Sequence, residues 1–461
     1  MRLKLAKFGA AWLTLAALFS LSATSMAAAA ASVGAAGGEE AKSARLMWKT
    51  NTIPVALSAS LTKNQQNIKF DSDVLGAVRR SLATWESVAN IKFIEVASEK
   101  MAVSPAGPAG DGVNLITVAP VDDNALLFTE DANEVSAKTR VFYNRRGIIS
   151  EADIALNPYV QFSTDGSNGT FDLEATLTHE IGHLLGLEHS HLPGSTMQAQ
   201  QGRNGIYNLQ QTASRTLSES DIANVRALYG PNIGEENCCG ALKGKIVLPQ
   251  QPASVSSAGG FQVWLEDVKT GRIQAGTLTK NDGTFSLEGL TPGRYRVLAQ
   301  DFSEKQKGRK SFSGGELGEV TIAAGETQNL ERQITFKERT FSLKYVGFNG
   351  QISNIPVAVN KGKSFEVYVG GEGLNPNEVT VFSNSGFVRV VPNSVKVQNF
   401  GEEISVLSVE ISLRPDTPPG EYSLRVQKKG GETAFFVGAL VNDLVVNPHV
   451  VFSFNSLSAL D

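Results

Sequence analysis

The sequence is poor in the residues that build disulfide scaffolds and bind metals, with two cysteines and five histidines among 461 residues. Two cysteines cannot form a disulfide scaffold or a cysteine-type zinc site. The formal net charge is -4 and no run is rich in lysine and arginine, which excludes a strongly basic nucleic-acid-binding protein. After residue 27 no stretch approaches ~18 apolar residues, so we expect a soluble mature chain that does not contact a membrane.

Residues 1–27 are typical of a secretory signal peptide. Three basic residues precede an apolar stretch at 8–22, and small residues then offer a cleavage site after Ala27. The apolar stretch is short for a membrane span, although an uncleaved anchor is the alternative interpretation. Residues 28–44 have no core-forming pattern and are expected to form a flexible tail. We therefore predict a secreted protein, periplasmic or extracellular.

Length and residue pattern divide the remaining chain into three parts. At roughly 100–200 residues per domain, 461 residues predict about three domains. Residues 45–230 combine helical and strand patterns, and Ser218 with Asp221 signals the start of a last helix that Gly230 ends. The other expected elements are strands near 53–57, 91–96, 113–118, 139–143 and 152–156 and helices near 71–89 and 172–186.

Helical patterns are absent from Cys239 onward. Residues 239–336 and 338–456 show alternating strands separated by turn residues such as Asp282-Gly283 and Pro418-Pro419-Gly420. Each segment has about the size of one β-sandwich. The predicted fold class is therefore an α+β domain followed by two all-β sandwich modules.

Cys238 and Cys239 are adjacent, at the junction between the α+β domain and the β modules. In an oxidising compartment they could form a disulfide with each other, cross-link to another chain, or stay free. The first alternative is favoured because the chain offers neither cysteine another partner.

Four of the five histidines lie within 13 residues. His179 and His183 are four residues apart, so on a helix they share one face and can hold one Zn²⁺ at ~2.0–2.1 Å. Glu180 is next to the first of them, where its carboxylate can reach a water on the metal. Gly186 can adopt a positive φ, which lets the chain turn and bring His189 to the metal as a third ligand.

Three protein ligands leave a fourth position open, which is the pattern of a catalytic zinc site. The alternatives are unconnected surface or core histidines and a purely structural zinc site, although structural sites usually have four protein ligands. His191 is then a solvated loop residue, because the ligand set is already complete. His449, near the C-terminus, is expected at the surface.

The motif from His179 to His189 resembles that of the metzincin metallopeptidases, and Ser190 and Ser195-Thr196-Met197 narrow the resemblance to secreted bacterial enzymes of the matrixin type. The resemblance covers about 45–230. It implies a zincin-like fold, in which a twisted, mostly parallel sheet has an antiparallel edge strand near 139–145 that pairs with the substrate. It also implies a zinc endopeptidase acting on proteins or peptides, with Glu180 as general base and Met197 as an apolar floor beneath the zinc.

The chain departs from the matrixin pattern in several ways. No histidine precedes residue 179, so the second, structural zinc of many matrixins is absent in its usual form. Ala199 stands where a proline is common, and residues 28–44 contain no cysteine that could block the zinc. The resemblance also allows calcium sites near acidic loops such as those at Asp111 and Asp165, without assigning ligands.

The C-terminal modules resemble, in turn pattern, a transthyretin-like sandwich of the carboxypeptidase-regulatory type at 239–336 and a bacterial immunoglobulin-like module at 338–456. Such modules space, stabilise or attach a secreted enzyme, and they could bind a cell-surface or matrix ligand. A carbohydrate ligand would need exposed aromatic side chains; Trp264 and a few Tyr and Phe residues are available, but most of these fit the alternation of a buried core. The alternative function is accordingly a surface or matrix-binding protein whose metal domain is silent or structural.

Overall fold

The computed structural model describes residues 45–208, 215–235, 237–248, 258–302, 312–334, 337–401 and 403–442. The predicted signal peptide at 1–27, the tail at 28–44 and His449 lie outside these residues. In the part of the chain that the structure describes, no helix is both long and apolar enough to cross a membrane.

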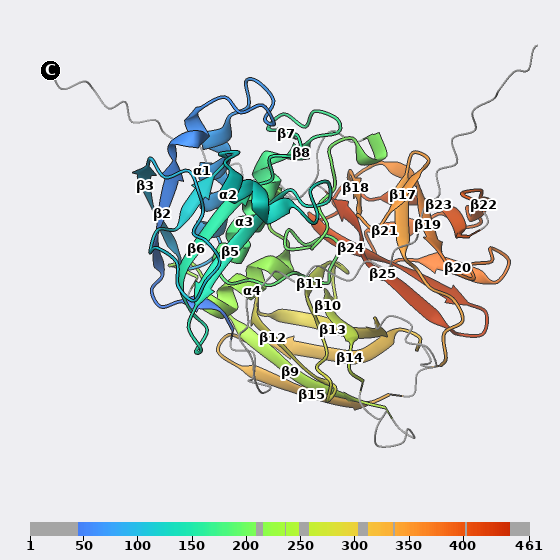
Figure 1. The fold of residues 1–461 in the computed structure, drawn as a ribbon. Helices are drawn as coiled ribbons and strands as arrows, with labels where there is room; N and C mark the ends of the chain where they lie inside the picture. Colours follow the sequence, from blue (N-terminus) through green and yellow to red (C-terminus); the bar gives the residue numbers. More distant parts are fainter. Residues whose placement is uncertain are drawn as a thin grey trace, which may run out of the picture. The chain divides into compact units, whose positions relative to one another are not determined.

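Residues 45–230, called the α/β module below, contain a six-stranded sheet (Figure 1). Its order is β1-β6-β4-β2-β3, with every pair along this path parallel, while β5 pairs with β6 antiparallel. The prediction of a mostly parallel sheet with one antiparallel strand near 139–145 is confirmed. The bounds are β1 Met47–Trp48, β2 Thr52–Ser58, β3 Lys92–Ser98, β4 Leu115–Thr117, β5 Ala137–Tyr143 and β6 Ile148–Leu156, with a separate short pair of β7 Phe162–Ser163 and β8 Phe171–Asp172.

Three long helices accompany this sheet, and each was predicted within a few residues. They are α1 Val74–Glu86, α3 Leu173–Leu184 and α4 Glu219–Tyr229. The capping box expected from Ser218 and Asp221 is present at the start of α4. The four-residue helix α2 Asp122–Ala125 and the short turns η1 Ala59–Thr62, η2 Leu126–Phe128 and η3 Ile206–Asn208 were not predicted, because such short elements show no periodicity.

The core of the α/β module joins the sheet to α1 and α3. Val55 on β2, Ile154 on β6 and Ile181 on α3 are fully buried in one hydrophobic cluster. Trp85 on α1 is also fully buried, and its indole Nε1 donates to the carbonyl of Thr178 on α3 at 2.8 Å. This bond fixes α3, the predicted metal-binding helix, against α1.

The first β module comprises two sheets within residues 240–333. One has the order β11-β10-β13-β14 and the other β12-β9-β15. Leu242 and Phe285 from one sheet share a core with Val263 and Val297 from the other, which makes the module a two-layer structure. The bounds are β9 Gly240–Val247, β10 Phe261–Asp267, β11 Ile273–Leu278, β12 Thr284–Leu290, β13 Gly293–Asp301, β14 Gly315–Ile322 and β15 Thr327–Gln333.

The second β module, within residues 345–442, also has two sheets. Their orders are β17-β16-β19-β23-β21, with β22 on β23, and β18-β25-β24-β20. Val369 and Val409 from the first sheet and Leu424 and Leu440 from the second are fully buried in one core. The bounds are β16 Tyr345–Phe348, β17 Gln351–Ser353, β18 Val357–Val359, β19 Ser364–Gly371, β20 Val379–Phe382, β21 Val388–Val390, β22 Lys396–Gln398, β23 Ser405–Leu413, β24 Gly420–Lys428 and β25 Thr433–Asn442.

Several strands of the β modules, β25, β10 and β24 among them, are buried on both faces over five or more consecutive residues and so depart from the expected alternation. All ten residues of β25, six of the seven of β10 and the first five of β24 are buried. Trp264 is among them with 0% exposure, which corrects its assignment as a candidate exposed aromatic for carbohydrate. Burial of both faces requires cover from other parts of the chain.

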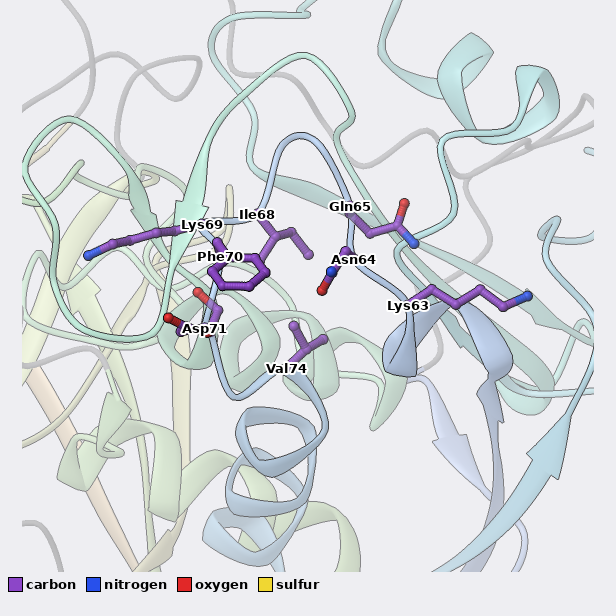
Figure 2. Close-up of a pocket in the computed structure, with 9 residues that line it drawn as sticks. Lys63, Asn64, Gln65, Ile68, Lys69, Phe70, Asp71 and Val74 are labelled. Carbon is purple, nitrogen blue, oxygen red and sulfur yellow. The ribbon is translucent and has the colours of Figure 1, made fainter.

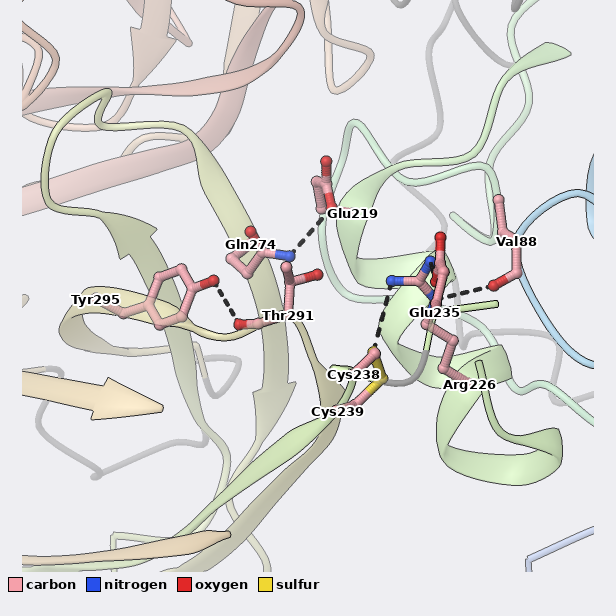
Figure 3. Close-up of a disulfide and its surroundings, with 9 residues drawn as sticks. All are labelled: Val88, Glu219, Arg226, Glu235, Cys238, Cys239, Gln274, Thr291 and Tyr295. Carbon is pink, nitrogen blue, oxygen red and sulfur yellow. Dashed lines mark hydrogen bonds and ion pairs between the residues drawn. A yellow bond between two sulfur atoms is a disulfide. The ribbon is translucent and has the colours of Figure 1, made fainter. Parts of the chain in front are cut away.

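Cys238 and Cys239 form a disulfide with each other, the favoured one of the three predicted alternatives (Figure 3). Arg226 of α4 lies beside it, with its guanidinium 3.8 Å from the Cys238 sulfur. The same guanidinium donates to the carbonyl of Val88 at 2.8 Å and pairs with Glu235. The chain leaving α4 is thereby held against the α/β module.

Candidate metal centre

The helix α3 begins at a well-defined cap and carries two of the predicted ligands. The Asp172 carboxylate accepts a hydrogen bond from the Ala175 N–H at 2.9 Å and is held in place by Arg215 at 2.6 Å. His179 and His183 follow within the helix, one turn apart, so their rings lie on the same face.

Gly186 brings the third histidine to the same point. It has φ 92°, and a Cβ at this position would lie 2.3 Å from the carbonyl oxygen of Leu46, so only glycine fits. The last carbonyls of α3 are bound by side chains, because Trp48 Nε1 donates to Leu184 at 2.8 Å and the Tyr229 hydroxyl to Leu185 at 2.6 Å. The helix therefore ends sharply, and the chain returns His189 to the face of α3.

The Nε2 atoms of the three histidines converge. His183 Nε2 is 3.1 Å from His179 Nε2 and 3.1 Å from His189 Nε2. His179 Nδ1 lies 2.7 Å from the Thr196 carbonyl and His183 Nδ1 2.8 Å from the Leu187 carbonyl, so each Nδ1 carries the proton and donates it. The Nε2 atoms of His179 and His183 are then both acceptors and cannot bond to each other.

A cation bound between the three rings would accept the lone pairs of these Nε2 atoms. Ligands at ~2.0–2.1 Å in a tetrahedral zinc site lie about 3.3 Å apart, close to the observed separations. Among the described residues, His179, His183 and His189 are the one group of three or more ligand residues close enough to share an ion. These residues fit zinc in ligand type, number and tautomer.

Burial keeps the two helical histidines neutral, as ligands must be. Desolvation lowers the pKa of His179 to about 4 and the pKa of His183 to about 3. It also lowers the pKa of the less buried His189. All three imidazoles are therefore uncharged at neutral pH, each with one ring nitrogen free of a proton, and can bind a metal without first losing a proton.

Glu180 lies beside the histidines with 4% exposure. The Thr139 hydroxyl, from β5, lies 2.5 Å from Glu180 Oε2 and 3.1 Å from the Glu180 carbonyl. Burial raises the pKa of Glu180, while the adjacent His183 and the hydrogen bond from Thr139 oppose this shift. A buried carboxylate with a raised pKa next to a ligand set is suited to accept a proton.

Met197, the predicted apolar floor, packs against α3, the helix that carries two of the predicted ligands. It is 1% exposed, and a Cβ on Gly182 of α3 would lie 2.2 Å from its sulfur. The turn before it is held by Asp221 of α4, whose carboxylate accepts from the Thr196 N–H at 2.8 Å and the Ser195 hydroxyl at 2.5 Å. Because Thr196 also accepts from His179, Asp221 supports a predicted ligand through one intermediate residue.

Sequence reasoning missed the roles of Thr139 and Asp221 at this site. Thr139 is 41 residues from Glu180, and no local pattern links them. Asp221 was predicted only as a helix cap, a role it also fills. The hydrogen-bond partners that give Thr139 and Asp221 these roles are distant in sequence, so only the folded chain identifies the two residues.

The remaining candidates do not join the site. His191 is exposed and outside the three-histidine group, as expected. Asp111 pairs with Lys100 and Asp165 with Lys69, so the two carboxylates named for calcium each have a lysine partner. A separate pocket contains none of the predicted site residues (Figure 2). Its lining is Lys63, Asn64, Gln65, Ile68, Lys69, Phe70, Asp71, Ser72 and Val74.

Residues 123–230, which include β5, α3 and α4, match the matrixin family model. Metalloendoproteinase 1-MMP of Arabidopsis thaliana is 29% identical over 191 residues, 40% of this chain and 45% of that protein. Matrix metalloproteinase-20 of Homo sapiens is 24% identical over 213 residues, 44% of this chain and 35% of that protein.

A solved major pilin of Corynebacterium diphtheriae is 11% identical, covering 42% of this chain and 63% of the pilin, with a TM-score of 0.17. That score is too low to assign a fold. The chain spans less than half the length of the two matched metalloproteinases. Its sequence similarity to matrixin metalloproteinases is confined to about two fifths of its own length and includes all of the candidate metal centre.

Proposed function

We propose that the chain is an exported zinc endopeptidase that hydrolyses peptide bonds in proteins. The observation that carries this proposal is the convergence of three neutral imidazoles beside the buried carboxylate of Glu180. Three protein ligands leave room for substrate, and an acceptor for a proton stands next to them. The similarity of residues 123–230 to matrixins supports the same conclusion.

Each residue has a role that its position supports. His179, His183 and His189 would hold the zinc ion, with His179 and His183 oriented by the carbonyls of Thr196 and Leu187. When bound, the zinc would polarise the substrate carbonyl and acidify water. Glu180 would take a proton from the attacking water and pass it to the leaving amine nitrogen.

The substrate would bind as an extended strand along β5. This strand pairs with β6, and among the described residues no strand occupies its other edge. Main-chain hydrogen bonds along that edge would place a peptide near Thr139 and Glu180. Such backbone recognition suits an endopeptidase, because it requires no chain end.

The β modules are proposed to be a transthyretin-like sandwich followed by an immunoglobulin-like one. Their two-layer cores support this proposal. A cell-surface or matrix ligand for them stays a prediction, and the burial of Trp264 removes one candidate contact. The alternative of a silent metal domain gains no support from Glu180, whose buried carboxylate is hydrogen-bonded beside the ligands.

The test is cleavage of a panel of denatured proteins and peptides by the purified mature chain, with zinc quantified. Glu180→Gln preserves the shape of the side chain but cannot accept the proton, so we expect zinc binding without turnover. Glu188→Gln is the matched control, because Glu188 is exposed in the same motif. It should cleave at the wild-type rate.

Each outcome is informative. Cleavage by wild type and Glu188→Gln alone, lost on chelation and restored by zinc, would support the proposal. Equal cleavage by Glu180→Gln would overturn the role of the carboxylate. A folded chain that binds no zinc would overturn the metal centre itself.

A further inference from the structure

The segment from His189 to Tyr207, called the ligand loop below, contacts all three modules. It contains the third predicted ligand, the turn at Met197 and the first part of the connection to α4. Its two buried anchors, Leu192 and Tyr207, insert into the β modules.

Leu192 is the first anchor, three residues after His189. It is 1% exposed in a cluster with Trp264, Ile273 and Leu298 of the first β module and Phe435 and Val437 of the second. A Cβ on Gly276 would lie 2.9 Å from the Leu192 side chain, which shows how closely β11 approaches it. The neighbouring carbonyl of His191 accepts from Gln262 Nε2 of β10 at 2.8 Å.

Tyr207 is the second anchor and belongs to the core of the second β module. It is 2% exposed, and its hydroxyl lies 2.9 Å from the Val346 carbonyl, 2.7 Å from the Ile355 carbonyl and 2.6 Å from the Ser353 hydroxyl. Its backbone has φ 56°, a conformation that a non-glycine residue adopts when its surroundings hold it there.

Between these anchors the ligand loop contacts the elements that frame the metal centre. Gln201 Oε1 accepts from the Ser136 hydroxyl, just before β5, at 2.6 Å and from the Thr176 hydroxyl of α3 at 2.9 Å. Asn204 exchanges backbone hydrogen bonds with Gly169 and Thr170 at 2.7 and 2.8 Å. The loop thus contacts α3 and the residue that precedes β5, the two elements beside which the proposed substrate strand would bind.

We propose that the two β modules position the ligand loop through Leu192 and Tyr207, and that they are working parts of the peptidase rather than appended binding modules. Leu192 comes only three positions after His189, and Tyr207 only six positions after Gln201. Over such short separations, a shift of Leu192 moves His189, and a shift of Tyr207 moves Gln201 at the border of the proposed substrate site. Leu192 and Tyr207 are positioning residues, since they act through His189 and Gln201.

The proposal rests on the proposed function for its kinetic test but also has a test that needs no turnover. Amide hydrogen exchange would be measured on the zinc-loaded, full-length chain for wild type, Leu192→Ala and Tyr207→Ala. We expect faster exchange in 190–207 of both variants, with β2 and β6 unchanged. Tyr207→Phe, which keeps the ring and loses the hydroxyl, should give a smaller increase in 201–207.

The kinetic test compares the best-cleaved peptide of the panel with derivatives changed at one residue after the scissile bond. Tyr207→Ala should change the ratio of their kcat/KM values by about tenfold, because the border of the site has moved. If a substitution only lowers the fraction of folded protein, the cleavage rates of all peptides fall by the same factor and the ratio of their kcat/KM values stays unchanged.

The matched control is Ile411→Ala. Ile411 is fully buried in the core that holds Tyr207, but it pairs with Phe365 and Val390, away from Val346. It should lower stability without changing exchange in 190–207 or the peptide ratio. Unchanged exchange in folded Leu192→Ala and Tyr207→Phe, or equal changes in Ile411→Ala, would overturn the proposal. Failure of wild type to cleave any peptide would refute only the proposed function, because exchange still reports on the loop.

Discussion

Replacing Glu421 by glutamine should remove a large part of the pH dependence of stability. Glu421 lies on β24 with 2% exposure, and neither carboxylate oxygen has a hydrogen-bond partner. It faces Gly194 of the ligand loop, where an added Cβ would lie 2.1 Å from its Oε1. Burial, reinforced by the negative charges of Asp221 and Glu219 and opposed by Arg272, raises the pKa of Glu421 to about 8.

The sign and size of the effect follow from this shift. The unfolded chain releases the proton near pH 4.5, whereas the folded chain keeps it until about pH 8. The free energy of unfolding therefore falls as pH rises through this window, at about 1.4 kcal/mol per pH unit, or about 5 kcal/mol in all. Glutamine does not titrate, but its buried amide would lack partners, at a cost of roughly 1–3 kcal/mol.

We expect Glu421→Gln to be less stable than wild type near pH 4.5 and more stable by roughly 2–4 kcal/mol at pH 8. Urea unfolding at half-unit steps from pH 4.5 to 8.5 measures this difference directly. Titrating groups that do not interact with Glu421, including the histidines, are common to both proteins and cancel. Glu410→Gln, an exposed position in the same module, is the control and should follow wild type. Parallel stability curves for wild type and Glu421→Gln would refute the reasoning.

Substitutions at three further positions test the candidate metal centre. Thr139→Val removes the hydroxyl that contacts Glu180, so kcat should fall about tenfold with little change in KM. Thr139→Ser should restore kcat, and equal rates for valine and serine would contradict the role of the hydroxyl. Asp221→Asn should destabilise the chain by about 2–4 kcal/mol and weaken zinc binding, measured by urea unfolding and chelator competition, because its carboxylate accepts several bonds in a buried site. Gly186→Ala forces a side chain onto φ 92° and the Leu46 carbonyl, so it should cost more than about 2 kcal/mol and lower zinc content; wild-type zinc affinity would contradict the turn argument.

The candidate metal centre was largely predictable because its signals are local. The four-residue spacing of His179 and His183, and Gly186 after them, specify a helix face and a turn without reference to the rest of the chain. The capping box of α4 is equally local. Alternation correctly predicted the buried faces of β12 and of the second half of β23, because one face of each packs on its own module.

What could not be predicted depends on segments far apart in sequence. The bond from Thr139 to Glu180, the support of the Met197 turn by Asp221 and the anchors Leu192 and Tyr207 have no periodic signature. Strand β25 is buried along its whole length, but its own residues do not show which segments of the chain cover its two faces.

The sequence by itself determined the candidate ligand set, the helix and turn that present it, and the strand-rich character of the C-terminal half, because these follow from backbone periodicity and residue chemistry within a few turns or strands. Only the tertiary structure decided which side chains orient Glu180 and where the ligand loop is anchored. The physical reason is that packing between modules depends on shape and on groups brought together by folding, and a residue carries no local record of its distant neighbours.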